Sequence, residues 1–184
     1  MAIDKITTAS ITDGTIATAD IADGAVTSVK TTGVGGVNTP AFLAYLSADQ
    51  TVGDSATVKI NINTEVYDTA NAYDNSSNYR FTPQTAGKYL VSANLEIDSG
   101  GGTHDITAGY CYLYKNGSVY ARARFDPDGD MFAMFAGLTI PVIMNGSSDY
   151  LEIYTYVDTT GGTQFIKGES GAARSWFSAI KIIE

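Results

Sequence analysis

Apolar and polar residues alternate along much of the chain after residue 40, and this period of two constrains the fold more than any other feature. Successive side chains of a β-strand point to opposite faces, so the pattern predicts strands with one face buried. In the clearest stretch, residues 88–98, the apolar positions are Tyr89, Val91, Ala93, Leu95 and Ile97. Comparable stretches are residues 41–46, 56–64, 79–81, 107–115, 119–125, 131–142, 149–157 and 175–183. Short strands divided by glycine-rich and polar turns predict an all-β sandwich.

Charge and hydropathy argue against two classes of partner. The chain has 11 Lys and Arg against 20 Asp and Glu, and its net charge of −9 opposes binding to nucleic acid. The apolar runs fall short of the roughly 20 residues that cross a bilayer, so we expect no membrane partner. The first ten residues, MAIDKITTAS, lack the apolar segment of a signal peptide, and we therefore expect synthesis in the cytoplasm.

Residues that often carry chemistry are scarce in this sequence. A single cysteine, Cys111, allows no internal disulfide, and its Tyr-Cys-Tyr-Leu setting predicts a packed strand residue. The one histidine, His104, lies in a glycine-rich loop, where we expect it to be exposed and without catalytic partners. A carboxylate pair for glycoside hydrolysis stays open, because such pairs are defined by their separation in space. On balance the sequence favours a protein that is not an enzyme.

The N-terminal segment carries one aliphatic residue at every fifth position, namely Ile6, Ile11, Ile16, Ile21 and Val26. A spacing of five matches neither the helical nor the strand period, so each unit needs a turn, and Asp-Gly pairs at residues 13–14 and 23–24 provide turn residues. One such ribbon cannot surround its own apolar groups, whereas three copies wound about an axis can bury them. We therefore expect a β-type stem with these five residues in its trimeric core. A flexible polar linker is the alternative.

A short segment, TTGVGG at residues 31–36, is typical of a flexible joint between two modules. The expected organisation is therefore a repeat stem and hinge over residues 1–36, followed by a globular domain over residues 37–184.

Several motifs of the globular part follow the order and spacing of a known family. They are PAFLAYL at residues 40–46, YRFTPQTAGKY at residues 79–89, the hairpin signal Asn116-Gly117 and SWFSAIKI at residues 175–182. Residues 40–184 resemble the complement-type globular head domain, which shares a ten-strand jelly roll with tumour necrosis factor. Within the second motif, Pro83 suits a strand end and Gly87 permits the turn that places Tyr89 on the inner face. The resemblance implies a jelly roll of ten strands and, because family members are trimers, a homotrimer.

Two of the predicted strands are apolar on both faces, because tyrosines alternate with aliphatic residues and Cys111. The tyrosines are Tyr110, Tyr112, Tyr114, Tyr150, Tyr154 and Tyr156. Tyrosine combines a large contact area with a polar tip and is enriched where subunits meet, so we expect these rows at the trimer interface of the head. The alternative is that they cover the outside of one sheet.

A short acidic turn is the one candidate metal site. Asp126, Asp128 and Asp130 alternate within the sequence DPDGD and could supply part of the oxygen shell of a calcium ion. The Pro-Asp-Gly sequence is also a common turn without any ligand. Calcium is therefore the only cofactor that the sequence suggests, and a solvated acidic turn is the stronger interpretation.

The stem points to a class of function. Stretches such as DGTIATADI, residues 13–21, resemble segments of bacteriophage fibre proteins. That resemblance implies a trimeric virion protein that decorates the capsid as a cement protein or short head fibre. Its stem would attach to the capsid through Ile3, Ile6 and Ile11, and its jelly roll would project outward. We expect the capsid rather than the tail because the stem is short and no larger tail-anchoring domain precedes it.

Other functions stay open. The nearest competitor is an adhesin of the tail fibre or tail tip, whose loops contact a glycan or protein of the host surface. A free complement-like protein that binds a ligand, and an enzyme that degrades polysaccharide, are less favoured. Fold alone does not decide among these functions.

Overall fold

A computed structural model describes residues 16–22, 24–25, 38–101, 104–129 and 131–182. The chain divides into two units, Met1–Val37 and Asn38–Glu184, and each is considered by itself. Among the described residues, no helix has the length and apolar character needed to cross a bilayer.

The structure describes only residues 16–22 and 24–25 of the expected stem, so the β-type stem stays a prediction. Thr18–Asp20 form a turn of 3-10 helix, η2, in which the carboxylate of Asp20 accepts a hydrogen bond from the backbone N–H of Ala17 at 2.9 Å. Such a local bond is typical of a turn, and a turn is expected in each unit of the repeat. Ile16 and Ile21 are exposed in the single chain, so their burial among three copies stays a prediction. The other aliphatic residues of the repeat, and Ile3, lie outside the described residues.

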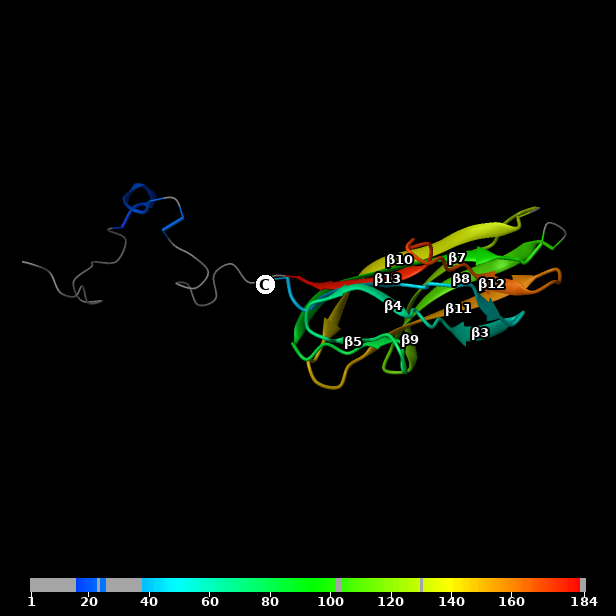
Figure 1. Cartoon of the computed structure of the whole chain (residues 1–184), viewed down its shortest axis with the longest axis horizontal. Coiled ribbons are helices and arrows are strands. Elements are labelled where there is room, and N and C mark those ends of the chain that lie inside the picture. The colour runs from blue at the N-terminus through cyan, green and yellow to red at the C-terminus, as the bar shows by residue number, and fades with distance from the viewer. Residues whose placement is uncertain (1–15, 23, 26–37, 102–103, 130, 183–184) are drawn as a thin grey trace, which may run out of the picture. The chain divides into compact units, whose positions relative to one another are not determined.

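The second unit is a sandwich of two antiparallel sheets (Figure 1). The first sheet contains seven strands: β1 (Ala41–Tyr45), β2 (Gln50–Val52), β4 (Thr64–Asp68), β7 (Gly87–Asp98), β10 (Ala133–Met144), β12 (Gln164–Ile166) and β13 (Trp176–Lys181). The second contains five: β5 (Tyr73–Asp74), β6 (Arg80–Phe81), β8 (Ile106–Lys115), β9 (Ser118–Phe125) and β11 (Leu151–Thr159). A further strand, β3 (Ala56–Lys59), runs beside β11.

The order of strands follows from which segments pair. In the seven-stranded sheet, β7 pairs with β10 along one edge and with β13 and β12 along the other, and β13 leads on to β1 and β4. In the five-stranded sheet the order is β5, β6, β11, β8 and β9. The described residues form thirteen strands instead of the expected ten. Several have only two or three residues, which is too short for an alternating pattern to reveal.

The alternation predicted for residues 88–98 is confirmed in β7. Its five apolar positions are buried, whereas residues on the other side of the strand are exposed or half-buried. The Asn-Gly hairpin is also present between β8 and β9, with positive φ at Asn116 (54°) and Gly117 (77°). Gly87 begins β7 with a φ of 145°, and the following Tyr89 is fully buried, as the sequence predicts.

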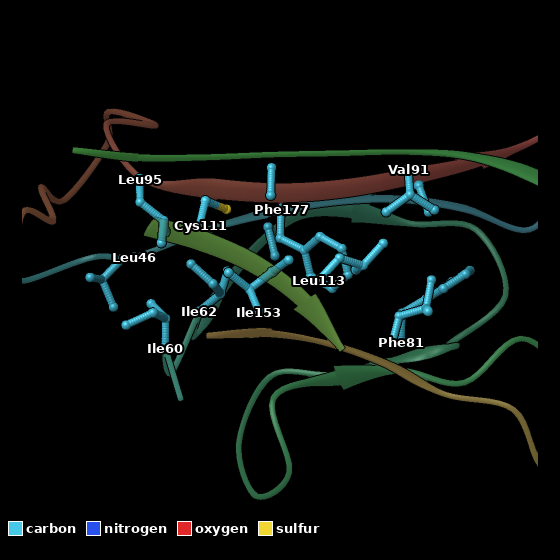
Figure 2. Close-up of a cluster of buried hydrophobic side chains, with 14 of the residues drawn as sticks. Leu46, Ile60, Ile62, Phe81, Val91, Leu95, Cys111, Leu113, Ile153 and Phe177 are labelled. Carbon is cyan, nitrogen blue, oxygen red and sulfur yellow. The ribbon is translucent and has the colours of Figure 1, made fainter. Parts of the chain in front are cut away.

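Aromatic rings from both sheets meet in the core. The ring of Phe42, on β1, lies 4.6 Å from that of Tyr73 and 4.6 Å from that of Phe81, both in the five-stranded sheet. Phe177, on β13, contacts it edge-on at 4.9 Å. Figure 2 shows side chains of both sheets, including Phe81 and Phe177, filling the space between the layers. These rings therefore hold the two sheets together.

Replacing Phe42 tests this role. Phe42→Ala removes a fully buried ring that contacts three others, and we expect it to lower the free energy of unfolding by about 3–5 kcal/mol. Phe125→Ala is the matched control, because its ring on β9 is exposed and its loss should cost about 1 kcal/mol or less. Urea unfolding followed by fluorescence measures both values, and equal losses would contradict the role of Phe42.

The prediction for Cys111 is confirmed, because its side chain is fully buried in β8. Burial raises the pKa of its thiol to about 12. The thiolate is the reactive form, so the native protein at pH 8 should not react with a disulfide reagent on the scale of minutes. In denaturant the same reagent should titrate one thiol per chain. Rapid reaction of the native protein would show that β8 opens readily.

Candidate binding surfaces

Each sheet of the sandwich has one face in the core and one face outside it, and the two outer faces differ in chemistry. On the five-stranded sheet, the outer face carries tyrosines of β8 and β11, which alternate with buried residues of the core. We call this surface the tyrosine face, and its rings are Tyr110, Tyr112, Tyr114, Tyr154 and Tyr156. All five are half-buried.

The rings of the tyrosine face pack on one another. Tyr110 and Tyr112 are parallel with centroids 5.3 Å apart, and Tyr114 stacks on Tyr154 of the neighbouring strand at 4.1 Å. Tyr156 meets Tyr110 edge-on at 5.4 Å. Burial raises the pKa of Tyr112 and of Tyr154 further above neutral pH. A protonated phenol hydroxyl can both donate and accept hydrogen bonds. The face therefore combines continuous aromatic area with phenol tips.

Arginines border these tyrosines, and the sequence analysis did not identify them. The pairing of β8 with β9 sets Arg124 opposite Tyr110 and Arg122 opposite Tyr112. The guanidinium of Arg124 lies 5.4 Å from the centroid of the Tyr110 ring. On the same face but beyond β11, the guanidinium of Arg80 on β6 lies 4.6 Å from the ring of Tyr150. Tyr150 precedes β11 and is not part of the stacked cluster.

Carboxylates neutralise only part of this positive charge. Arg124 pairs with Asp126 at 2.7 Å. Glu152, on the outer side of β11, is buried and forms an ion pair with Lys59 at 2.5 Å. Among the described residues, neither Arg80 nor Arg122 forms an ion pair with a carboxylate. These two guanidinium groups are therefore available to an anionic group from outside.

The outer side of the seven-stranded sheet is different, and we call it the apolar face. Phe135 and Ile143, both on β10, are 63% and 66% exposed, the highest values among the large apolar side chains of the described residues. Between them, residues in register across the sheet are uncharged. One row consists of Pro141, Leu90 and Ile180, and the next of Thr139, Ser92 and Ser178. Glu96 lies opposite Phe135 and Lys88 lies opposite Ile143, so charged residues border these uncharged rows at both ends. Exposed apolar side chains grouped in this way often mark a contact with another protein.

Two shallow hollows lie on this apolar face, one on each side of Trp176. The first, of about 380 Å³, is lined by Leu43 and Tyr67 together with residues of β13. The second, of about 280 Å³, is lined by Asn94 and Gly137 with their neighbours on β7 and β10. The single tryptophan of the chain therefore stands between two recesses that can receive side chains of another molecule.

The remaining predicted site residues do not assemble into a chemical centre in the described part of the chain. Asp126 is held by Arg124, Asp128 is exposed in the turn, and Asp130 lies outside the described residues. No three His, Cys, Asp or Glu side chains of the described residues lie together in a metal-binding cluster. Calcium binding therefore stays a prediction. His104 is half-buried instead of exposed, because its ring lies against Gly161 and Gly162.

Comparison with known proteins gives the fold and a relative. Eiger TNF from S. frugiperda superposes with a TM-score of 0.55 at 11% identity, covering 77% of this chain and 91% of that one. Murine APRIL superposes with a TM-score of 0.56 at 7% identity, covering 77% and 98%. The chain is 29% identical over 133 residues to the phage-like element PBSX protein XkdV of Bacillus subtilis strain 168. That match covers 67% of this chain and 18% of the relative. No model of a known protein family matches the chain.

These similarities establish part of the expectation. The globular domain is a jelly roll like that of the tumour necrosis factor proteins, and the chain is similar to a segment of a protein from a phage-like element. The complement-type identity of the head and the phage-fibre character of the stem stay predictions. The chain spans less than a fifth of the length of its relative, so the role of that whole protein is not transferred to it.

Proposed function

We propose that this chain is a homotrimeric structural protein of phage particles that acts by binding and not by catalysis. The similarity to a protein of a phage-like element supports the association with phage. The main support for self-association is the apolar face, where Phe135 and Ile143 are exposed to water in the single chain. Covering such side chains gains about 25 cal/mol for each Å² removed from water.

The edge of the sheet supports the same conclusion. Strand β10 has twelve residues without a charged side chain and pairs only with β7, so its other edge has no strand partner among the described residues. A long, uncharged edge strand invites association unless something covers it. Packing the β10 edge of one copy against the apolar face of the next joins two different patches. Contacts of that kind form a closed ring when the rotation is right, and three copies give the expected trimer.

The tyrosine face is a weaker candidate for the subunit contact than the sequence suggests. Its rings already cover one another, and all five are half-buried in the single chain. The prediction that these tyrosines line the trimer interface is not tested by the single chain. We propose the apolar face instead, because more of its large apolar side chains are left uncovered.

Within the particle we propose that the jelly roll decorates the capsid. The stem would attach it through Ile3, Ile6 and Ile11, which lie outside the described residues. A second candidate is an adhesin of the tail fibre. The observation that favours it is the length of the relative, because a module that makes up 18% of a longer protein is typical of a fibre assembled from several domains.

The trimer can be tested by sedimentation equilibrium of the full chain. We expect a mass near 58 kDa, three times the 19.4 kDa of one chain. Replacing Phe135 and Ile143 together by Ser should raise the trimer dissociation constant about a hundredfold, because the burial of the two most exposed large apolar side chains would be lost. Val119→Ser, an exposed position on the five-stranded sheet, is the control and should leave it unchanged. A wild-type mass near 19 kDa would contradict the proposal.

The location can be tested on purified particles with a gold-labelled antibody against the globular domain. Label distributed over the capsid surface is the expected result. Label confined to the tail or its tip would replace capsid decoration with the adhesin. Absence of label from particles that contain the gene for the protein would contradict both.

A further inference from the structure

Two guanidinium groups that form no ion pair with a described carboxylate flank the tyrosine face from opposite sides. Arg122 of β9 is in register with Tyr112 of β8, which is in register with Tyr154 of β11. Arg80 of β6 is in register with Glu152 of β11 on the same side of the sheet. Neighbouring strands lie about 4.8 Å apart, so β6 and β9 are separated by roughly 14 Å of aromatic surface.

Most of the arginines gather at this surface, although the chain as a whole is acidic. The net charge is −9, yet three of the four arginines lie at the tyrosine face. Charges farther away than about 8 Å are largely screened at physiological ionic strength. For a ligand in contact with the surface, the guanidinium groups of Arg80 and Arg122 therefore outweigh the acidic residues elsewhere. Two carboxylates lie nearby and already have partners. Glu152 is paired with Lys59, and Asp74, which is in register with Arg80, accepts hydrogen bonds from the backbone N–H groups of residues 76–78.

The combination of groups indicates a class of ligand. Stacked phenol rings offer aromatic area against which a sugar ring can pack, and their protonated hydroxyls can bond to sugar hydroxyls. A guanidinium group binds a carboxylate through two parallel hydrogen bonds. We propose that the tyrosine face binds a polysaccharide that carries carboxylate groups, with Arg80 and Arg122 holding the carboxylates and the tyrosines packing against the sugar rings.

This inference rests on the proposed function in one respect, namely that the trimer contact lies on the apolar face and leaves the tyrosine face outward. A second copy of the chain is a poorer occupant of the tyrosine face. Phe135 and Ile143 have the most exposed large apolar side chains of the described residues, and both lie on the other sheet. Half-buried phenol rings suit a polar ligand whose sugar rings have apolar faces. They suit the apolar surface of another protein less well.

Isothermal titration calorimetry of the full chain tests the proposal with defined probes. The acidic probe is an oligosaccharide of galacturonic acid, and the neutral probe is a maltooligosaccharide of the same length. We expect binding of the acidic probe only. Arg122→Gln and Arg80→Gln should each weaken it about tenfold or more, because each removes a charge-assisted pair of hydrogen bonds. Lys181→Gln, which removes one positive charge from the other sheet, should leave it unchanged.

The other outcomes overturn the proposal. These are no binding, equal binding of both probes, and binding that Arg122→Gln and Arg80→Gln leave intact. Sedimentation of the same variants separates this test from that of the trimer. If Arg122→Gln dissociates the trimer, the tyrosine face is the subunit contact and the ligand proposal is wrong. If the wild-type chain is monomeric but binds the acidic probe through Arg122, the proposed trimer fails and the ligand site stands.

Discussion

Burial of alternate side chains between the two sheets is the interaction on which the rest of this structure depends. The ring of Phe42 contacts Tyr73 and Phe81 of the opposite sheet, and most long strands send every second residue into the same layer. The remaining residues of each strand must then lie on one of two outer faces. The fold therefore fixes where any uncovered aromatic or apolar residue appears, and it keeps the two faces apart.

This separation lets one small domain have two kinds of contact. The apolar face, with an uncharged edge strand and hollows beside Trp176, suits a rigid protein surface such as another copy. The tyrosine face, with its bordering guanidinium groups, suits a polar ligand that forms hydrogen bonds. A trimer that uses the first face presents three copies of the second, and repeated weak sites gain strength through their effective concentration.

The sequence predicts the long elements well and the surfaces only in part. Alternation identifies β7, and Asn116-Gly117 identifies the hairpin, because both signals are local. The sequence does not place the arginines opposite the tyrosines, because a bulge between Leu113 and Tyr114 shifts the pairing by one residue. Without that bulge, Tyr112 would face an alanine instead of Arg122. The sequence does not reveal the apolar face, because strand β10 is apolar on both sides and only its partners show which side is left uncovered.

Hydroxyl-radical footprinting of the native full chain tests the central claim, that the two outer faces have different occupants. Oxidation of each side chain is read by mass spectrometry and depends on its access to solvent. If the seven-stranded sheet is the subunit contact, Phe135 and Trp176 should be protected relative to a dissociated sample, while Tyr112 and Tyr154 should be oxidised equally in both. Protection of the tyrosines together with free oxidation of Phe135 would contradict the claim.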